Sequence, residues 1–300
     1  MTAAELLEAE PIQAQDGFAA YAVTTKSGPH VTMQAGVVQA GRFITTTSRV
    51  SLKARCVRAH RVAAATVERD DGSTEVVAGP TVAVDLRDPV GMLTDPAGTL
   101  IAGPAALRLA GDQLEQLLGY LEAAGKVPTG WLPHNRVMLV TRIDRSLRVE
   151  GFDLLDGSGD WTPELPAPSD LQRTDGRRPG SLPDVPDDVQ HLVHADAPAR
   201  LGFATPAGPV VLPARWQGQD RFDVSAGALA QVRATLPGPG CATFDDSSSR
   251  RPDEKRGVML RGHLDLVDVD GPQATVAIRT ERITAWDGFS ASTSDVDEPS

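Results

Sequence analysis

A segment rich in hydroxyl side chains that leads into a basic helix carries the residues best suited to chemistry. Residues 45–55 read Thr-Thr-Thr-Ser-Arg-Val-Ser-Leu-Lys-Ala-Arg. Ser48 is a good N-cap, so the pattern predicts a helix whose first turn exposes backbone N–H groups, and these donors and the helix dipole favour an anion. Hydroxyl, guanidinium and ammonium groups all donate to phosphate oxygens. The side chains that we expect at this phosphate site are Thr46, Thr47, Ser48, Arg49, Ser51 and Lys53.

The positive charge of the chain is concentrated in the same region. The net charge is −11, which argues against a nucleic-acid binder. Residues 17–67 nevertheless contain seven Lys and Arg and no Asp or Glu, so this stretch carries +7 and the remainder carries −18. The positive stretch fixes where a small anion would bind, while the overall charge discourages long polyanions. We therefore expect a small-molecule ligand, and neither nucleic acid nor a membrane as a partner.

Short strands must position this site. Runs rich in β-branched residues predict strands at 19–25, 30–38 and 42–47 before the helix and at 61–67 after it. The 28 Gly and 23 Pro favour many short elements over a helical bundle. Cys56 falls on the apolar face of the helix, so we interpret it as a core residue and not as a nucleophile.

Several features predict a cytoplasmic protein. The sequence contains no run of 18 apolar residues, its first residues are acidic without a basic stretch, and two cysteines are too few for a disulfide framework. We expect no metal site, because the pair His191 and His194 has no third ligand nearby in the sequence.

The chain repeats itself after residues 156–188, which are rich in Pro, Gly, Asp and Ser and predict a linker. The run Gly-Pro-Val-Val at 208–211 matches Gly-Pro-His-Val at 28–31, and Asp-Arg-Phe at 220–222 matches Gly-Arg-Phe at 41–43. A short helix and further strands follow in the same order in both copies. Two copies of one small antiparallel barrel explain this best, because closing a barrel removes the sheet edges.

The first copy resembles the flavin- and deazaflavin-dependent split-barrel oxidoreductases, the pyridoxamine 5'-phosphate oxidase-like superfamily. That family's usual order is a Gly/Pro turn and strand, hydroxyl residues, a Ser-x-Lys-Ala-Arg-Asn helix and a basic strand. The matching runs here are 28–31 (Gly-Pro-His-Val), 45–48 (Thr-Thr-Thr-Ser), 51–55 (Ser-Leu-Lys-Ala-Arg) and 60–62 (His-Arg-Val). Cys56 replaces the usual Asn, and Ala59-His60 replaces Asp-Pro.

The resemblance implies a mainly β fold of two tandem split β-barrels that form an intramolecular pseudo-dimer. The expected limits are a first barrel over 1–155, the linker over 156–188, a second barrel over 189–290 and an acidic tail over 291–300. The molecule would then be a monomer with an internal pseudo-dimer, or a further homodimer of it.

The resemblance also implies a cofactor, FMN or the deazaflavin coenzyme F-420, with its phosphate on the Ser/Lys helix. We expect one cofactor per chain, because the second copy has Ser-Ala-Gly at 225–227 opposite residues 46–48 and Ala230 or Gln231 in the region of Lys53. The cofactor would exchange a hydride with a small organic substrate, and no side chain would act as a catalytic nucleophile.

Further residues are expected around the cofactor ring. The backbone at Gly36 and Val37 would lie against the ring, because glycine allows close approach. The candidates for the substrate side are Trp131, His134, Arg215, Trp216 and Trp286.

Two alternatives to an oxidoreductase remain open. The first is a non-catalytic protein that binds or sequesters a flavin or haem in the same cleft, in which His30, His60 or His134 would be the axial ligand. The second is a structural module with an empty cleft, against which the intact hydroxyl and lysine set of the first copy argues.

Overall fold

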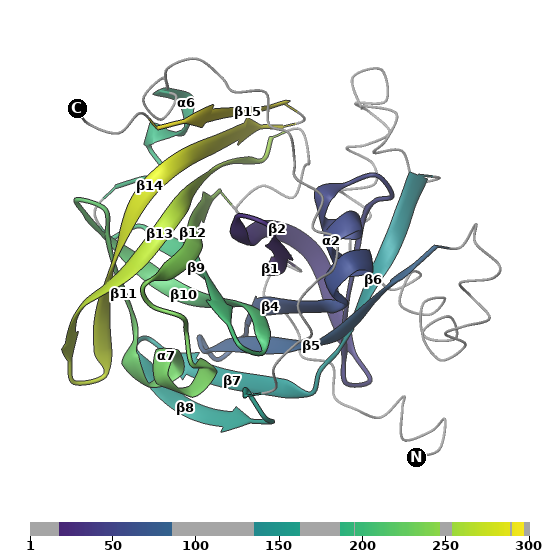
Figure 1. Cartoon of the computed structure of the whole chain (residues 1–300), viewed down its shortest axis with the longest axis horizontal. Coiled ribbons are helices and arrows are strands. Elements are labelled where there is room, and N and C mark those ends of the chain that lie inside the picture. Colours follow the sequence, from purple (N-terminus) through teal and green to yellow (C-terminus); the bar gives the residue numbers. More distant parts are fainter. Residues whose placement is uncertain are drawn as a thin grey trace.

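Two closed β-barrels, built from consecutive halves of the chain, lie side by side (Figure 1). The computed structural model describes residues 18–85, 135–162, 187–194, 196–246, 254–288 and 290–296. Every strand pairing in these residues is antiparallel.

The first half closes six strands into a ring in the order β1-β2-β3-β6-β5-β4, with β4 pairing back onto β1. A helix follows β3, and a hairpin pairs with β5 outside the ring. These elements are β1 (Phe18–Thr25), β2 (Gly28–Gln39), β3 (Arg42–Ser48), α2 (Leu52–His60), β4 (Val62–Glu68), β5 (Thr74–Val84), β6 (Arg136–Arg142), β7 (Arg145–Glu150) and β8 (Asp153–Ser158).

The second half closes six strands in the equivalent order, β9-β10-β11-β14-β13-β12, and β12 pairs back onto β9. Its elements are α6 (Asp187–Gln190), β9 (Pro198–Thr205), β10 (Gly208–Gly218), β11 (Arg221–Ser225), α7 (Ala226–Val232), β12 (Gly238–Asp245), β13 (Arg256–Asp270), β14 (Gln273–Asp287) and β15 (Ser290–Asp295). The matching strand order confirms the predicted duplication and the mainly β, two-barrel fold.

The two barrels contact each other through equivalent strands, β2 against β9 and β12, and β10 against β1 and β4. Two threonine hydroxyls cross the junction in opposite directions. The Thr66 hydroxyl donates to the Val211 carbonyl at 2.6 Å, and the Thr243 hydroxyl donates to the Val31 carbonyl at 3.3 Å. The halves are therefore related by an approximate two-fold axis that passes between β2 and β10.

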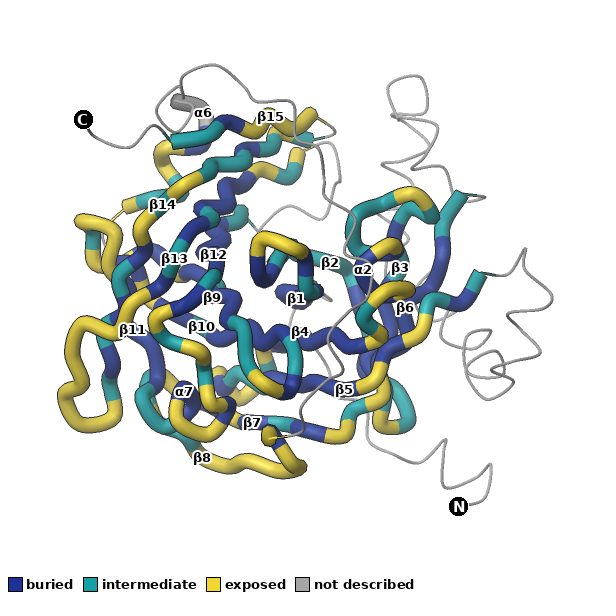
Figure 2. Tube along the Cα trace, viewed as in Figure 1, coloured by how far each residue is buried: buried dark blue, intermediate teal, exposed yellow. Residues whose placement is uncertain are grey.

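A single hydrophobic cluster continues through the junction. It joins Val31 and Ala64 of the first half to Leu201, Phe203 and Val211 of the second. These central strands form the dark, buried centre of Figure 2. A separate cluster fills the first barrel around the stacked rings of Tyr21 and Phe43, whose centroids are 5.8 Å apart.

Several sequence expectations differ from the structure. The predicted N-cap at Ser48 is wrong: α2 begins at Leu52 and its N-cap is Ser51. The limit expected at 155 falls inside β8, and the expected acidic tail starts inside β15. Short strands with polar, exposed faces carry little hydrophobic pattern, which explains why these two were missed. The domain limits themselves stay a prediction.

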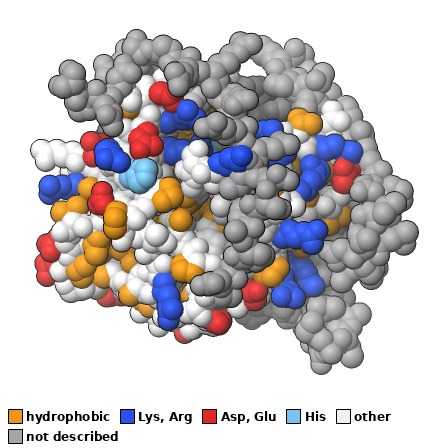
Figure 3. Space-filling model, viewed as in Figure 1, with side chains coloured by type: hydrophobic (Ala, Val, Ile, Leu, Met, Phe, Trp, Pro, Cys, Tyr) orange, Lys and Arg blue, Asp and Glu red, His pale blue; other side chains and the backbone are white. Residues whose placement is uncertain are grey.

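Among the helices of the described residues, none combines the length and hydropathy that crossing a membrane requires. In the space-filling view, several Lys and Arg side chains lie on the right, where Figure 1 shows α2 and β6 (Figure 3).

Candidate functional site

Helix α2 holds Lys53 against strand β2. The Ser51 hydroxyl oxygen accepts a hydrogen bond from the Ala54 amide at 3.1 Å, which caps the helix, and the Thr47 hydroxyl donates to Ser51 at 3.0 Å. Lys53 is the second residue of the helix, and its Nζ donates to the Thr32 hydroxyl at 3.1 Å. Burial of the ammonium group, and after it the charge of Arg136, lowers the pKa of Lys53 to about 7.

The predicted hydroxyl groups are used in different ways. Thr46 accepts from Arg136 twice, through its hydroxyl and through its carbonyl oxygen, each at 3.1 Å. Thr47 and Ser51 hydrogen-bond to each other at the helix cap. The Ser48 hydroxyl is buried without a hydrogen-bond partner. An incoming acceptor would therefore satisfy Ser48, while the other hydroxyls already serve the fold.

Among the described residues, no hydrogen bond or ion pair links Arg49 to Lys53. The Nη2 atom of Arg49 lies 2.5 Å from Asp85 Oδ1, and its carbonyl accepts from Arg58. The charge of Arg49 is thus balanced by Asp85, although its Nε is buried without a partner.

The glycine expected beneath a cofactor ring has a packing explanation. A Cβ at Gly36 would lie 2.4 Å from the edge of the Phe43 ring inside the first barrel. Phe43 therefore requires glycine at this position whether or not a ligand is near. A contact of Gly36 and Val37 with a cofactor stays a prediction.

An arginine from the second half reaches the same side of β2. The Nη2 atom of Arg261, on β13, lies 2.8 Å from Nδ1 of His30. A guanidinium only donates, so His30 accepts through Nδ1 and is neutral. Burial, the charge of Arg261 and the charge of Lys53, in that order, hold the pKa of His30 well below its usual value.

The candidates for the substrate side are not gathered around Lys53. Trp131 and His134 lie outside the described residues. Trp216 packs against Phe222 and Phe244 in the second barrel, with centroid distances of 4.7 and 5.7 Å, which is a structural role.

The other two candidates also have protein contacts. Arg215 stacks over the Phe152 ring at 5.6 Å. Trp286 lies against Gly257, where a Cβ would come within 2.1 Å of its ring. No hydrogen bond or ring contact of the described residues joins either side chain to Lys53.

The histidines considered as haem ligands differ in availability. His30 uses Nδ1 for Arg261, whereas Nε2 of His60 is buried without a partner. Burial lowers the pKa of His60, which keeps its imidazole neutral. His60 is the last residue of α2, eight positions beyond the first residue, Leu52, so it lies at the opposite end of the helix from Lys53.

Both cysteines are buried thiols. Burial raises the pKa of Cys56 and of Cys241 to about 11, so neither is a thiolate at neutral pH. Cys56 packs in the core of the first barrel. This agrees with its interpretation as a core residue.

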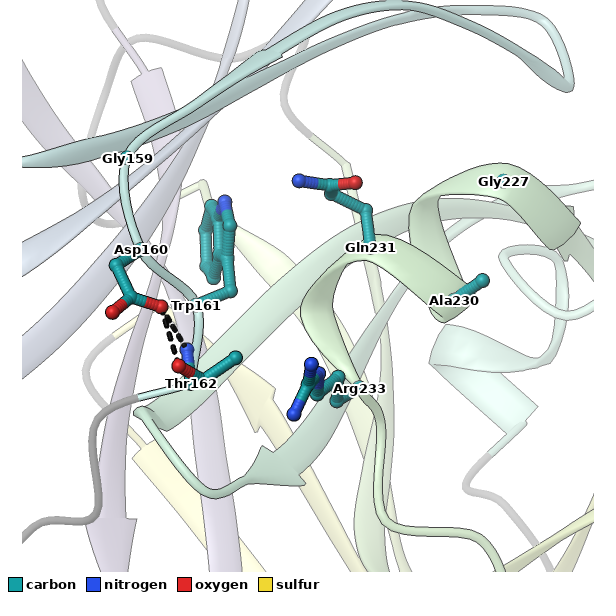
Figure 4. A pocket seen from close by; sticks show the side chains of 8 residues that line it. All are labelled: Gly159, Asp160, Trp161, Thr162, Gly227, Ala230, Gln231 and Arg233. Carbon is teal, nitrogen blue, oxygen red and sulfur yellow. Dashed lines mark hydrogen bonds between the residues drawn. The ribbon is translucent and has the colours of Figure 1, made fainter.

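A polar cavity of about 370 Å³ lies beside helix α7. The residues that line it are Gly159, Asp160, Trp161, Thr162, Gly227, Ala230, Gln231 and Arg233 (Figure 4). The Asp160 carboxylate accepts from the Thr162 amide and hydroxyl at 2.8 and 2.6 Å. This cavity contains no lysine, because the residue of α7 that corresponds to Lys53 is a glycine.

The caps align the two helices residue by residue. Ser225 caps α7 through the Ala228 amide, as Ser51 caps α2 through Ala54. Gly227 is thus the equivalent of Lys53, and the expectation of Ala230 or Gln231 is wrong. Three residues separate β3 from α2 but none separates β11 from α7, and this insertion shifted the sequence comparison.

Searches with known protein families and with curated proteins find no match to this chain. Solved structures do match in part. A pyridoxamine 5'-phosphate oxidase-related, FMN binding protein from Nostoc punctiforme is 13% identical, with 45% of this chain and 74% of that chain covered and a TM-score of 0.33.

Two other structures match to a similar extent. An F420 reductase is 18% identical, with 45% of this chain and 92% of that chain covered and a TM-score of 0.29. A heme binding protein from Mycobacterium smegmatis is 13% identical, with 52% and 56% covered and a TM-score of 0.33. The first two are proteins of the kind that the sequence resemblance named. At these TM-scores the likeness says nothing of this chain's ligand, so any inference about the ligand must come from the residues of the chain's own site.

Sequence reasoning missed two arginines at this site. Arg136 starts β6 and reaches Thr46 because its strand pairs with β3, with Arg136 opposite Ser48. Arg261 comes from the other half of the chain. A strand-by-strand comparison of the two copies could have marked Arg261, since its equivalent in the first copy is an alanine, Ala78.

Proposed function

We propose that the chain binds FMN or the deazaflavin coenzyme F-420 by its phosphate group at Lys53 and works as a cytoplasmic oxidoreductase. The supporting observation is Lys53 itself: its ammonium group lies below the surface, and no ion pair of the described residues balances it. Leaving a cation unpaired in a protein interior is costly, so an anionic ligand would stabilise this arrangement.

The residues present fit a phosphate group. The Ser48 hydroxyl and Nε of Arg261 are buried without partners, so donors remain for phosphate oxygens. Lys53 supplies the charge, and Arg136 fixes Thr46 at the end of β3. When bound, the cofactor would supply hydride transfer to a small organic substrate. The chain would bind and orient it, and no side chain of the described residues is assigned a proton-transfer step.

Direct binding tests this proposal. The protein is purified, its absorption spectrum is recorded, and it is titrated with FMN and with the deazaflavin. Binding of one of them at micromolar concentration is expected. A Lys53→Ala variant should bind at least about tenfold more weakly, because a charge-assisted contact contributes ~1.5–3 kcal/mol. Binding of neither cofactor would contradict the proposal.

The same spectrum examines the alternative. A Soret band without hydride transfer would favour a haem-binding protein, for which His60 is a described candidate with a buried, unpartnered ring nitrogen. Gel filtration distinguishes a monomer from a further homodimer. A monomer is expected, because the internal pseudo-dimer already completes the junction between the barrels.

A further inference from the structure

Arg261 is a cation from the second half that enters the first half's site. It lies on β13 and contacts His30 on β2. Its Nε is buried without a hydrogen-bond partner, and no ion pair of the described residues includes it. Burial lowers the pKa of Arg261, which reflects the cost of removing this charge from water.

Lys53 and Arg261 meet the same face of one strand. Lys53 donates to Thr32 and Arg261 contacts His30, two residues earlier on β2. Side chains two residues apart on a strand point the same way and are separated by roughly 7 Å. The two cations are therefore close enough for one ligand to contact both, and each keeps partial exposure.

The internal symmetry supplies a comparison site. In the first half Val23 pairs with His30, and in the second Phe203 pairs with Val210. In the next strand pairs, Ala64 of β4 pairs with Ala78 of β5, and Cys241 of β12 pairs with Arg261 of β13. With the helix caps, this register defines four equivalent pairs: His30 and Val210, Thr32 and Leu212, Lys53 and Gly227, and Arg261 and Ala78.

These four pairs differ in the same direction. Three of the equivalents, Val210, Leu212 and Ala78, are buried apolar residues, and the fourth, Gly227, carries no side chain and faces Leu154. One of the two symmetric locations is thus polar at all four positions, and the other is polar at none. Arg261 belongs to this polar set although it comes from the other half of the chain.

We propose that Lys53 and Arg261 form a single phosphate site assembled from both halves of the chain. Its ligand is a phosphate group, carried by a phosphomonoester or by inorganic phosphate. The second half then supplies an arginine to the first half's site, and its own four equivalent positions, Val210, Leu212, Gly227 and Ala78, carry no charged or polar side chain. The inference rests on the proposed function, since it places the same phosphate.

Calorimetric titration of the full chain tests this site. The probes are inorganic phosphate, FMN and the deazaflavin, and the variant is Arg261→Gln. Arg279→Gln is the matched control, because Arg279 is an exposed arginine of β14 and its replacement removes the same charge. We expect Arg261→Gln to weaken binding at least about tenfold and Arg279→Gln to change it less than about twofold.

Arg261→Lys covers the case in which Arg261→Gln does not fold. It keeps the charge but loses the planar fork, so we expect binding about three- to tenfold weaker than in the wild type. Unchanged affinity in either Arg261 variant overturns the inference.

The outcomes separate the two proposals. A cofactor that needs Lys53 but not Arg261 overturns the inference and leaves the proposed function intact. Inorganic phosphate that needs Arg261, with neither cofactor bound, supports the inference and contradicts the proposed function. Absence of binding for all three probes at millimolar concentration overturns both.

Discussion

At the scale of single residues, the site depends on two cationic side chains, those of Lys53 and Arg261, that are largely removed from the water that would otherwise stabilise their charges. Lys53 has one hydroxyl partner, and Arg261 has one imidazole partner. Both partners are neutral, so neither cancels a charge. The ligand-free protein therefore pays an electrostatic cost at β2 that a bound anion would remove.

The depressed pKa of Lys53 makes ligand binding depend on pH. The ammonium form binds the anion, and with a pKa of about 7 its population falls as pH rises above 7. Between pH 7 and 9 we expect the dissociation constant for FMN to rise by up to about tenfold per pH unit. Fluorescence titration of FMN over this range measures it.

A Lys53→Arg variant is the control, since its guanidinium stays charged over that range and its curve should be flat. A wild-type curve as flat as that of the variant would contradict the prediction.

The same pKa shift makes the ligand-free protein more stable as pH rises, whereas ligand binding becomes weaker. The unfolded chain keeps the Lys53 proton up to about pH 10.5, so this group raises the free energy of unfolding as pH rises from about 7 to 10.5.

How far the sequence predicted this site can be judged residue by residue. Lys53 and the hydroxyl residues stand out in the sequence because they are contiguous and their side chains can all donate to an anion, and their role in binding stays a prediction. Arg49 could not be excluded, because its partner Asp85 is 36 residues away. Arg261 was missed, because its approach to His30 depends on the packing of one barrel against the other, which no local pattern encodes; only a comparison of the two copies strand by strand could have marked it.

At the scale of elements, the cap of α2 sets the position of Lys53. The helix is nine residues long and begins after the chain has left β3 through three connecting residues. Ser51 fixes its first turn, and the left-handed Arg61 ends it with a hydrogen bond to the Val57 carbonyl. The sequence predicted this helix but placed its start three residues early, since Ser48 and Ser51 both suit an N-cap.

Replacing the cap should separate folding from binding. Ser51→Ala removes the acceptor for the Ala54 amide and should cost about 1 kcal/mol of stability. It should also weaken FMN binding, because the first turn that carries Lys53 frays. Ser225→Ala removes the equivalent cap of α7 and should cost a similar amount with unchanged binding. Equal effects of the two variants on binding, measured beside urea denaturation curves, would disprove this assignment of the site to α2.

At the scale of the whole molecule, the junction between the two barrels joins the halves through both apolar and polar contacts. The hydrophobic cluster passes through the junction without a break, and polar contacts reinforce it. The Arg145 guanidinium donates to the Ala207 carbonyl at 2.9 Å, and Arg200 pairs with Glu68 across the halves. The repeat predicted two barrels from the sequence, but two independent cores would also have satisfied that pattern.

The shared core predicts that the halves unfold together. Gly202 lies at the junction, where an added Cβ would come within 2.7 Å of Val31 Cγ2 and 2.9 Å of Cys241 Sγ. Because both neighbours belong to packed strands, Gly202→Ala should lower the free energy of unfolding by about 1–3 kcal/mol. Urea denaturation followed by tryptophan fluorescence and by far-ultraviolet circular dichroism should give one coincident transition in both proteins, shifted to lower urea in the variant. Two separated transitions, of which the substitution shifts only the one that belongs to the second half, would mean that the first barrel is stable alone. That result would also require Arg261 to reach its site by docking of a folded second half rather than by folding with it.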